Sequence, residues 1–284
     1  MTPNERVTVV TVTYNSSRVL PSMLETVPAE TPLVIVDNNS PDIADVRTLA
    51  ESRGARLIAN TTNEGFGVAC NRGAAVAETE FLLFLNPDAQ LSSGALAELV
   101  LAAERYPAAS GMNPRILGAN GEPFFRRRSH LLPRAQRMKH GSPTADCEVN
   151  ILTGAALFVR RQHFEAVGGF DPEIFLFYED DDLTLRLRKA IGPAMFVHAA
   201  TVRHVGGSSS PQTSTLRLKA WHMGSARVYT TRKHGMRWAR SDALAKAVLR
   251  LASPAVLMSS QRRAEQMSYL RGVLHGIARR KSQR

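Results

Sequence analysis

The sequence predicts an α/β protein whose core is a mixed, mainly parallel sheet flanked by helices. Short apolar runs alternate with helical patterns at about 30-residue spacing through the first third of the chain, as expected for βαβ units. Four of these runs stop abruptly at polar residues. With 284 residues and 44% hydrophobic content, the chain can bury a full core, in one large domain or two small ones.

The first predicted strand runs directly into a polar segment. Residues 7–17, VTVVTVTYNSS, are apolar and β-branched until they reach Asn15, Ser16 and Ser17. These three side chains can cap a helix predicted over residues 17–27.

The next two strands also end at polar residues or glycines. Residues 33–42, LVIVDNNSPD, give a short buried strand that ends at Asp37. Residues 57–75 give a strand, a polar loop and a helix opened by Gly65 and Gly67.

The fourth run, FLLFLNPDA over residues 81–89, has five apolar residues that stop at Asn86. Pro87 cannot donate to a ladder, so Asp88 is expected at the carboxyl edge of the sheet. Ligands of open α/β sheets bind at that edge, which favours a binding role for Asp88. The alternative is a polar residue that only starts a turn.

A second concentration of acidic residues lies in GGFDPEIFLFYEDDDLTLRLRKA, residues 168–190. The apolar IFLFY leads into four acidic residues, 179–182, which open a predicted helix. The helix dipole and the spacing of Asp182 from Arg186 explain one or two of them. At least one of the others is expected to be partly buried, with a pKa raised toward that of a general base.

Residues 194–210, AMFVHAATVRHVGGSSS, are predicted as a strand that carries His204 near its end. A lone histidine is usually an ordinary surface or core residue. If His204 lies in the same cleft as Asp88, the two could bind Mn²⁺ or Mg²⁺ together with diphosphate oxygens.

A basic stretch over residues 124–141, FFRRRSHLLPRAQRMKHG, shows little periodicity. Segments of this length without regular structure are either functional lids or disordered. Arg126, Arg127 and Arg128 could contact a phosphate-bearing substrate, or the segment could be a solvated loop.

The net charge of +11 is concentrated at the carboxyl-terminal end. Residues 212–284 contain 16 Lys+Arg and 2 Asp+Glu, a balance of +14, while residues 1–211 contain 20 and 23, a balance of −3. The basic segment lacks the interleaved aromatic residues of a nucleic-acid surface, so no nucleic-acid partner is expected. Its apolar positions recur at helical spacing and either face an anionic membrane or pack on the main domain: Leu244, Val248, Leu251, Met267, Leu270, Leu274 and Ile277.

Compartment and cysteine chemistry follow from what the sequence lacks. No apolar run approaches the ~20 residues of a spanning helix, and residues 1–5 do not resemble a signal peptide. We therefore expect a cytoplasmic protein. Cys70 and Cys147 fit no metal or redox spacing and are expected to be ordinary thiols.

Taken together, seven motifs in this order resemble the family 2 inverting glycosyltransferases of GT-A fold, and within them the bacterial rhamnosyltransferase-like branch. The motifs span about residues 6–210 and are VTVTYNSS, VIVDNNSPD, NEGFGVACNRG, FLNPDA, TGAALFVRR, GGFDPEIFLFYEDDDLTLRLRKA and HVGGSSS. The resemblance implies a Rossmann-like domain over residues 1–211 and a basic helical extension over 212–284. Its nucleotide-binding half would cover about 1–110 and its acceptor and catalytic half 111–211.

The resemblance also implies roles for individual residues. Asp37 would hydrogen-bond the pyrimidine base of the donor. Asp180 would be the catalytic base, with Glu179 orienting the acceptor, and Asp88 and His204 would bind the divalent metal. Residues implied to bind the nucleotide sugar are Thr11, Thr13, Asn15, Asp37, Asn63, Gly65, Gly67, Asn71, Asn86 and Asp88.

One position departs from the family pattern. Asn86 replaces the first carboxylate of the DxD motif, so the metal would have one protein carboxylate fewer, and strict metal dependence is open.

The function implied is inverting transfer of a sugar from a nucleotide-diphosphate donor to a hydroxyl of a cell-surface glycan or lipid-linked acceptor. By resemblance the donor is dTDP-rhamnose and the cofactor Mn²⁺ or Mg²⁺. Alternatives are a UDP-linked hexose donor, a nucleotidyltransferase of related architecture, and a nucleotide-sugar-binding protein, which the retained carboxylates disfavour. The basic extension would place the enzyme at the inner face of the membrane or form a homodimer.

Overall fold

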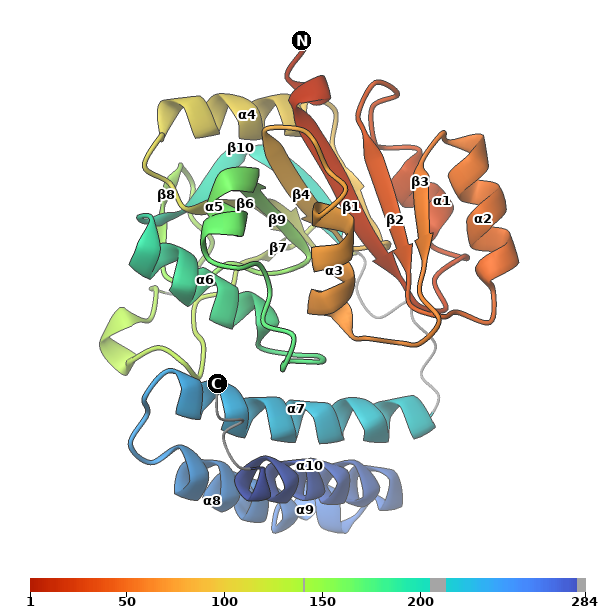
Figure 1. Cartoon of the computed structure of the whole chain (residues 1–284). Helices are drawn as coiled ribbons and strands as arrows, with labels where there is room; N and C mark the ends of the chain where they lie inside the picture. The colour runs from red at the N-terminus through yellow and green to blue at the C-terminus, as the bar shows by residue number, and fades with distance from the viewer. Residues whose placement is uncertain (140, 205–212, 280–284) are drawn as a thin grey trace. The chain divides into compact units, whose positions relative to one another are not determined.

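The computed structural model describes residues 1–139, 141–204 and 213–279 (Figure 1). Within these residues, ten strands join one mixed sheet. The strands are β1 (Val7–Thr13), β2 (Leu33–Asp37), β3 (Arg56–Ala59), β4 (Phe81–Leu85), β5 (Ala89–Leu91), β6 (Gly111–Leu117), β7 (Pro123–Phe124), β8 (Cys147–Val149), β9 (Ala156–Arg160) and β10 (Ala194–His204).

The strand order is β3-β2-β1-β4-β9-β6-β10-β5, with β7 beside β6 and β8 beside β10. All pairs among β1, β2, β3 and β4 are parallel, and so is the β6–β10 pair. The antiparallel strand β9 connects these two parallel groups. The predicted mixed, mainly parallel α/β sheet is confirmed, and its first four strands lie where the apolar runs placed them.

Helices cover both faces of the sheet (Figure 1). Residues of α1, α2 and α4 pack into the hydrophobic core on one face, and residues of α3, α5 and α6 pack into the core on the other. The bounds are α1 (Leu20–Leu24), α2 (Ile43–Ser52), α3 (Phe66–Ala74), α4 (Ala95–Arg105), α5 (Arg161–Ala166) and α6 (Glu179–Ala190). Two single turns complete this part, η1 (Asn4–Arg6) and η2 (Arg134–Gln136).

The first helix differs from its prediction. α1 starts at Leu20, not at residue 17, and its N-cap residue Val19 makes no side-chain capping bond. Ser16 instead hydrogen-bonds the carbonyl of Tyr14 within the preceding loop. Pro21 in the first turn supplies a preset φ and does not require a capping acceptor.

The chain divides into two compact units, and the second contains a segment that the sequence did not assign to it. Unit 1 comprises residues 1–171 and 180–209, while unit 2 comprises residues 172–179 and 210–284. The predicted boundary at residue 211 stays a prediction. The eight residues 172–179, expected inside the first domain, cluster with the carboxyl-terminal helices.

Unit 2 contains α7 (Thr213–Lys233), α8 (Ala239–Leu251), α9 (Pro254–Leu257) and α10 (Ser260–Ala278). Small residues let α7 and α10 approach closely. A Cβ added at Gly224 would lie 2.3 Å from the Tyr269 carbonyl oxygen, and one added at Gly272 would lie 2.0 Å from that of Trp221. Gly276 follows Gly272 at the i+4 position and is confined as well, because a Cβ there would lie 2.9 Å from Val228 Cβ. Glycine at these three positions therefore allows the close approach of α7 and α10.

The apolar stripes of the basic segment are only partly buried. On α8 the core side is formed by Ala239, Ala243 and Ala247, while Leu244, Val248 and Leu249 are exposed. On α10, Leu270 and Ile277 pack against the core of unit 2, whereas Met267 and Leu274 are exposed. Apart from the residues left undescribed, no helix is both long and apolar enough to cross a bilayer.

Candidate active site

The carboxyl ends of β1 and β2 place Thr13 and Asp37 side by side. These residues are register partners, and the Thr13 hydroxyl donates to Asp37 Oδ2 at 2.9 Å. Ser40 adds its backbone N–H to Oδ1 at 2.8 Å and its hydroxyl to Oδ2 at 2.6 Å. The buried Asp37 carboxylate therefore fixes the loop that follows β2.

Two more predicted nucleotide residues lie at the same edge. Asn15 has φ of 54°, a left-handed conformation that asparagine tolerates, and its N–H donates to the Ser40 hydroxyl at 3.0 Å. Thr11 is buried, and its hydroxyl has no hydrogen-bond partner among the described residues. Buried hydroxyls are rarely left without a partner, but Thr11 is 0% exposed, so a bound group could reach this hydroxyl only if neighbouring side chains moved.

The glycine loop before α3 is held by the neighbouring strand end. Asn63 Oδ1 accepts the N–H of Gly65 at 3.0 Å, and Asn38 donates to the Gly65 carbonyl, also at 3.0 Å. Gly65 has φ of 86°, which only glycine adopts readily.

Gly67 and Asn71 face Phe170 in the structure. A Cβ at Gly67 would lie 2.9 Å from Phe170 Cβ. The Asn71 amide donates to the Phe170 carbonyl and accepts its N–H, both at 2.8 Å. These two residues connect the glycine loop to the segment before the acidic cluster, a role that the sequence did not indicate.

Asp88 and His204 lie within direct contact distance of each other. Their Oδ1 and Nε2 atoms are 3.1 Å apart, and the Asn86 amide nitrogen is 3.3 Å from the same Nε2. The antiparallel pairing of β5 with β10 produces this contact, because Ala89 is the register partner of His204. One carboxylate oxygen and one imidazole nitrogen thus converge, as a shared cation would require. In the described ranges, no three His, Cys, Asp or Glu side chains are grouped so that they could hold a metal ion by themselves.

Asp180 accepts three hydrogen bonds at the start of α6, and one of them is donated to its Oδ1 by the N–H of Asp181 at 2.8 Å. Its Oδ2 lies 2.5 Å from Arg126 Nη1 and 3.0 Å from the N–H of Gly154. About 15% of the Asp180 side chain is exposed, whereas its neighbours Asp181 and Asp182 are fully buried. Of these three aspartates, Asp180 is the one that a substrate can reach.

The other acidic residues of the cluster have internal partners. Asp181 pairs with Arg126 at 2.7 Å and accepts the Ser129 hydroxyl at 2.6 Å. Asp182 pairs with Arg186 one turn later at 2.8 Å, as its spacing predicted. Glu179 is largely buried and belongs to the segment that clusters with unit 2.

The raised pKa expected in this cluster belongs to Asp181. Burial, reinforced by the negative charge of Asp180, raises the pKa of Asp181 to about 7, while Arg126 and Ser129 oppose the shift. A fully buried carboxyl cannot receive a proton from an acceptor hydroxyl, so this pKa concerns stability.

Between pH 3.8 and about pH 7, Asp181 keeps its proton in the folded protein but has lost it in the unfolded chain. The free energy of unfolding should therefore fall as the pH rises through this range. Asp181→Asn removes this titration and keeps the shape of the neutral acid. We expect the melting temperature of wild type to fall more steeply from pH 5 to pH 7.5 than that of Asp181→Asn. Exposed Asp45→Asn is the control and should follow wild type, and parallel curves for all three proteins would contradict the assignment.

A short backbone segment joins the two acidic regions into one site. The carbonyl of Ala155 accepts the N–H of Asn86 at 3.0 Å, and the preceding residue, Gly154, donates to Asp180. The Asn113 side chain fixes the segment by accepting the N–H of Thr153 at 2.7 Å. The sequence motif TGAALFVRR marked this segment, but nothing local indicated Asn113.

The glycine loop reaches the same place. A Cβ built at Gly154 would lie 3.5 Å from Phe66 Cε1 and 3.6 Å from Asp180 Cβ. The first residue of α3 and the first turn of α6 therefore meet at Gly154. One position at the carboxyl edge of the sheet is therefore surrounded by the glycine loop, Asn86 and Asp180.

Part of the basic stretch contributes to this site. In the described part of residues 124–141, regular structure is limited to the end of β7 and η2, as the lack of periodicity indicated. Arg126 does not stand in solvent: it bridges Asp180 and Asp181.

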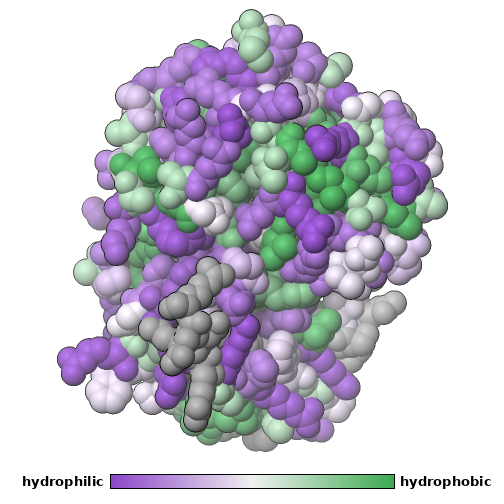
Figure 2. All heavy atoms as spheres, in the orientation of Figure 1, coloured by the Kyte–Doolittle hydropathy of each residue, from purple (hydrophilic) through white to green (hydrophobic). Residues whose placement is uncertain are grey.

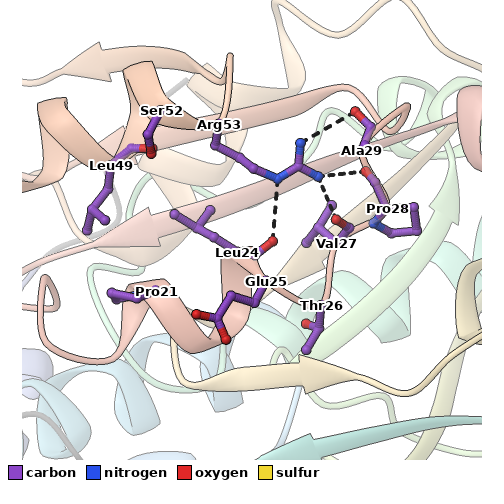
Figure 3. Close-up of a pocket in the computed structure, with 10 residues that line it drawn as sticks. All are labelled: Pro21, Leu24, Glu25, Thr26, Val27, Pro28, Ala29, Leu49, Ser52 and Arg53. Carbon is purple, nitrogen blue, oxygen red and sulfur yellow. Dashed lines mark hydrogen bonds between the residues drawn. The ribbon is translucent and has the colours of Figure 1, made fainter.

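A cavity of about 570 Å³ lies elsewhere, beside α1 and the end of α2 (Figure 3). Arg53 donates there to the carbonyls of Val27 and Pro28, at 2.5 and 2.7 Å. The loops before β2 and β3 form it, so it lies at the amino edge of the parallel strands, opposite the site. It contains none of the predicted functional residues.

A nucleotide-type sheet with a glycine loop, an Asp–His pair and a partly exposed carboxylate at one edge defines a glycosyltransferase of GT-A fold. The model of Glycosyl transferase family 2 matches residues 8–168, more than half of the chain. The chain belongs to this family.

Similar proteins agree with this assignment. The chain is 29% identical to N-acetylglucosaminyl-diphospho-decaprenol L-rhamnosyltransferase of Mycobacterium tuberculosis, over 90% of this chain and 94% of that protein. The fold is similar to that of a mannosyltransferase from Pyrobaculum calidifontis in complex with GDP-Man and Mn²⁺, with TM-score 0.61 and 18% identity, over 96% of this chain and 87% of that one. It is also similar to GalNAc-T7 with UDP, GalNAc and Mn²⁺, with TM-score 0.56 and 16% identity, over 84% of this chain and 54% of that longer one.

Proposed function

We propose that this glycosyltransferase transfers L-rhamnose, with inversion, from dTDP-rhamnose to a hydroxyl of a lipid-linked or cell-surface glycan acceptor. The observation that carries the proposal is the 29% identity to a mycobacterial L-rhamnosyltransferase, which extends over nearly the full length of both chains. That relative is named for a lipid-linked acceptor, and the carboxylates retained in this chain would provide the chemistry for transfer.

The donor would lie along the carboxyl edge of the sheet. Its pyrimidine would lie at the end of β2, at the loop that the buried Asp37 fixes through Ser40, with Thr11, Thr13 and Asn15 nearby. The sugar and diphosphate would extend past the glycine loop toward Asn86 and Asp88, with Asn63, Gly65, Gly67 and Asn71 as the remaining predicted contacts.

Asp180 would act as the base. The acceptor hydroxyl is a poor nucleophile, so a carboxylate must take its proton as it attacks the anomeric carbon. The Arg126 and Gly154 donors hold the Asp180 carboxylate in one orientation, and Glu179 would orient the acceptor. One base and one displacement invert the anomeric centre.

The residues at Asp88 and His204 suit a divalent cation shared with the donor diphosphate. One carboxylate oxygen and one imidazole nitrogen 3.1 Å apart are appropriate donors for Mn²⁺ or Mg²⁺. When bound, such an ion offsets the negative charge that develops on the leaving diphosphate. Two similar folds were solved with Mn²⁺.

A thermal-shift panel tests the donor assignment. A ligand that binds only the folded state at 100 times its Kd stabilises it by about 2.7 kcal/mol. We expect dTDP-rhamnose with Mn²⁺ to raise the melting temperature more than UDP-glucose or UDP-N-acetylglucosamine. A larger shift in melting temperature with a UDP-hexose would assign that sugar nucleotide as the donor. In a separate assay of the products, release of diphosphate in place of nucleoside diphosphate would indicate a nucleotidyltransferase.

We also propose that unit 2 binds an anionic membrane surface at the cytoplasmic face, where a lipid-linked acceptor would be available. Exposed apolar residues lie among basic ones on its helices and at the helix ends: Trp238, Leu244, Val248, Leu249, Met258, Met267 and Leu274. Figure 2 shows hydrophilic and apolar residues interspersed on the visible surface of the protein. Each Lys or Arg near such a surface contributes about 1 kcal/mol.

Flotation with liposomes tests this binding. We expect the full chain to float with anionic but not neutral vesicles, and Leu249→Asp to reduce flotation severalfold. Leu101→Asp, at an exposed leucine of α4, is the matched control. Failure of the wild-type protein to float with anionic vesicles would contradict membrane binding. If the protein is a dimer without lipid and Leu249→Asp dissociates it, the exposed apolar residues of unit 2 would form a homodimer contact instead.

A further inference from the structure

The segment directly before the catalytic carboxylate belongs to the helical unit. Residues 172–179 cluster with residues 210–284, while residues 1–171 and 180–209 form the sheet unit. The chain therefore leaves the sheet unit for eight residues and returns at Asp180. Whatever fixes these eight residues also fixes the entry of the chain into the first turn of α6.

The helices contact this segment at Glu173 and at Phe175, and a buried cation of α7 acts on its end through charge. Glu173 forms an ion pair with Arg279, which follows the end of α10. The Phe175 ring stacks on His222 of α7, with centroids 4.2 Å apart and an interplanar angle of 16°. Tyr178 is close enough to Arg227 of α7 to interact with it electrostatically.

Arg227 connects these contacts to the rest of unit 2. It is an almost completely buried cation, hydrogen-bonded to the Tyr269 hydroxyl of α10 at 3.3 Å and to Asp242 of α8 at 2.9 Å. Three helices thus meet at the residue that interacts with Tyr178.

The backbone of the segment is strained just before α6. Phe177 and Tyr178 have φ of 71° and 69°, a left-handed conformation that bulky side chains rarely adopt. Two such residues in succession persist only where the surrounding structure determines them, and such strain clusters at functional sites. The stacking contact of Phe175 lies two residues before Phe177, and the electrostatic interaction with Arg227 is at Tyr178.

We infer that the carboxyl-terminal helices act as a positioning device for the catalytic base, with His222 and Arg227 as positioning residues that hold the strained turn through Phe175 and Tyr178. This inference rests on the proposed role of Asp180. It assigns to the helical unit a function in catalysis that is separate from membrane binding.

Kinetics of three variants of the full chain test the inference. His222→Ala removes the stacking ring, and His222→Phe keeps one. We expect His222→Ala to lower kcat by on the order of tenfold or more with donor Kd within about twofold, because small displacements of a reacting group are costly. His222→Phe should recover most of the loss. Val273→Ala, which is buried in the core of unit 2, should lower the melting temperature without a comparable loss of kcat.

Hydrogen exchange provides a readout that does not depend on the substrate. His222→Ala should accelerate exchange of the amides over residues 174–182, while Val273→Ala should not. Unchanged exchange in His222→Ala, or a loss of kcat in both variants in proportion to their melting temperatures, would overturn the inference. Absence of transfer by wild type from any nucleotide sugar would contradict the proposed function instead, and exchange would still decide whether the helices fix the turn.

Discussion

Asp180→Asn is expected to lower kcat by at least about 100-fold while donor Kd changes less than about twofold. Asparagine keeps the shape of the side chain and its contact with the Gly154 N–H, but it cannot take the proton of the acceptor hydroxyl. Because donor binding does not require this proton transfer, the loss should appear in kcat. Turnover and donor binding are measured separately, by product formation and by calorimetry.

The neighbouring aspartates are the matched controls for this substitution. Asp181→Asn alters a buried carboxylate that contacts Arg126 and Ser129. Asp182→Asn alters a buried carboxylate that pairs with Arg186. We expect them to change stability more than kcat. Near-normal turnover of Asp180→Asn together with an inactive Asp181→Asn or Asp182→Asn would transfer the role of base to that neighbour.

Asp88→Ala is expected to abolish the Mn²⁺-dependent part of donor binding, because it removes a carboxylate that contacts His204. Calorimetric titration of the donor, with Mn²⁺ and with a chelator, measures this difference. Asp146→Asn is the control: it alters a carboxylate that is hydrogen-bonded to β10 outside the site, so Mn²⁺ should still strengthen donor binding.

Adding a carboxylate at position 86 should strengthen metal binding at the same site. Asn86→Asp would put a second carboxylate next to His204, and cation affinity depends on the charge of the ligands. We expect Mn²⁺ affinity to rise by on the order of tenfold. If a chelator leaves wild-type binding and turnover intact and Asn86→Asp changes neither, the site works without metal and His204 would contact phosphate directly.

Much of the first half of the fold could be predicted from local sequence. β1, β2 and β4 are buried apolar runs, and such runs determine both the strand and the point where it ends. The closeness of Asp88 and His204 followed from placing both at the same edge of the sheet, and the structure confirms that they are adjacent.

The contacts around Asp180 could not be predicted in this way. Arg126 and Gly154 reach it from 54 and 26 residues away in sequence. Their approach depends on β9 lying between β4 and β6, an order that no local pattern encodes. The sequence indicated a raised pKa in the acidic cluster, but only three-dimensional burial identifies Asp181 as its location.

The packing of the carboxyl-terminal helices could also be predicted only in part. Spacing identified Leu244 and Val248 as one face of α8, but the helix packs through Ala239, Ala243 and Ala247. Close helix packing favours small residues, so the larger side chains remain exposed. That residues 172–179 cluster with these helices depends on contacts between distant parts of the chain.

The anomeric configuration of the transferred sugar tests the central claim most directly. NMR of the product made from dTDP-rhamnose and a lipid-linked acceptor analogue gives this configuration from the coupling at the anomeric carbon. A single displacement with Asp180 as base predicts a linkage of the opposite anomeric configuration to that of the donor. A product that retains the donor configuration would contradict the mechanism.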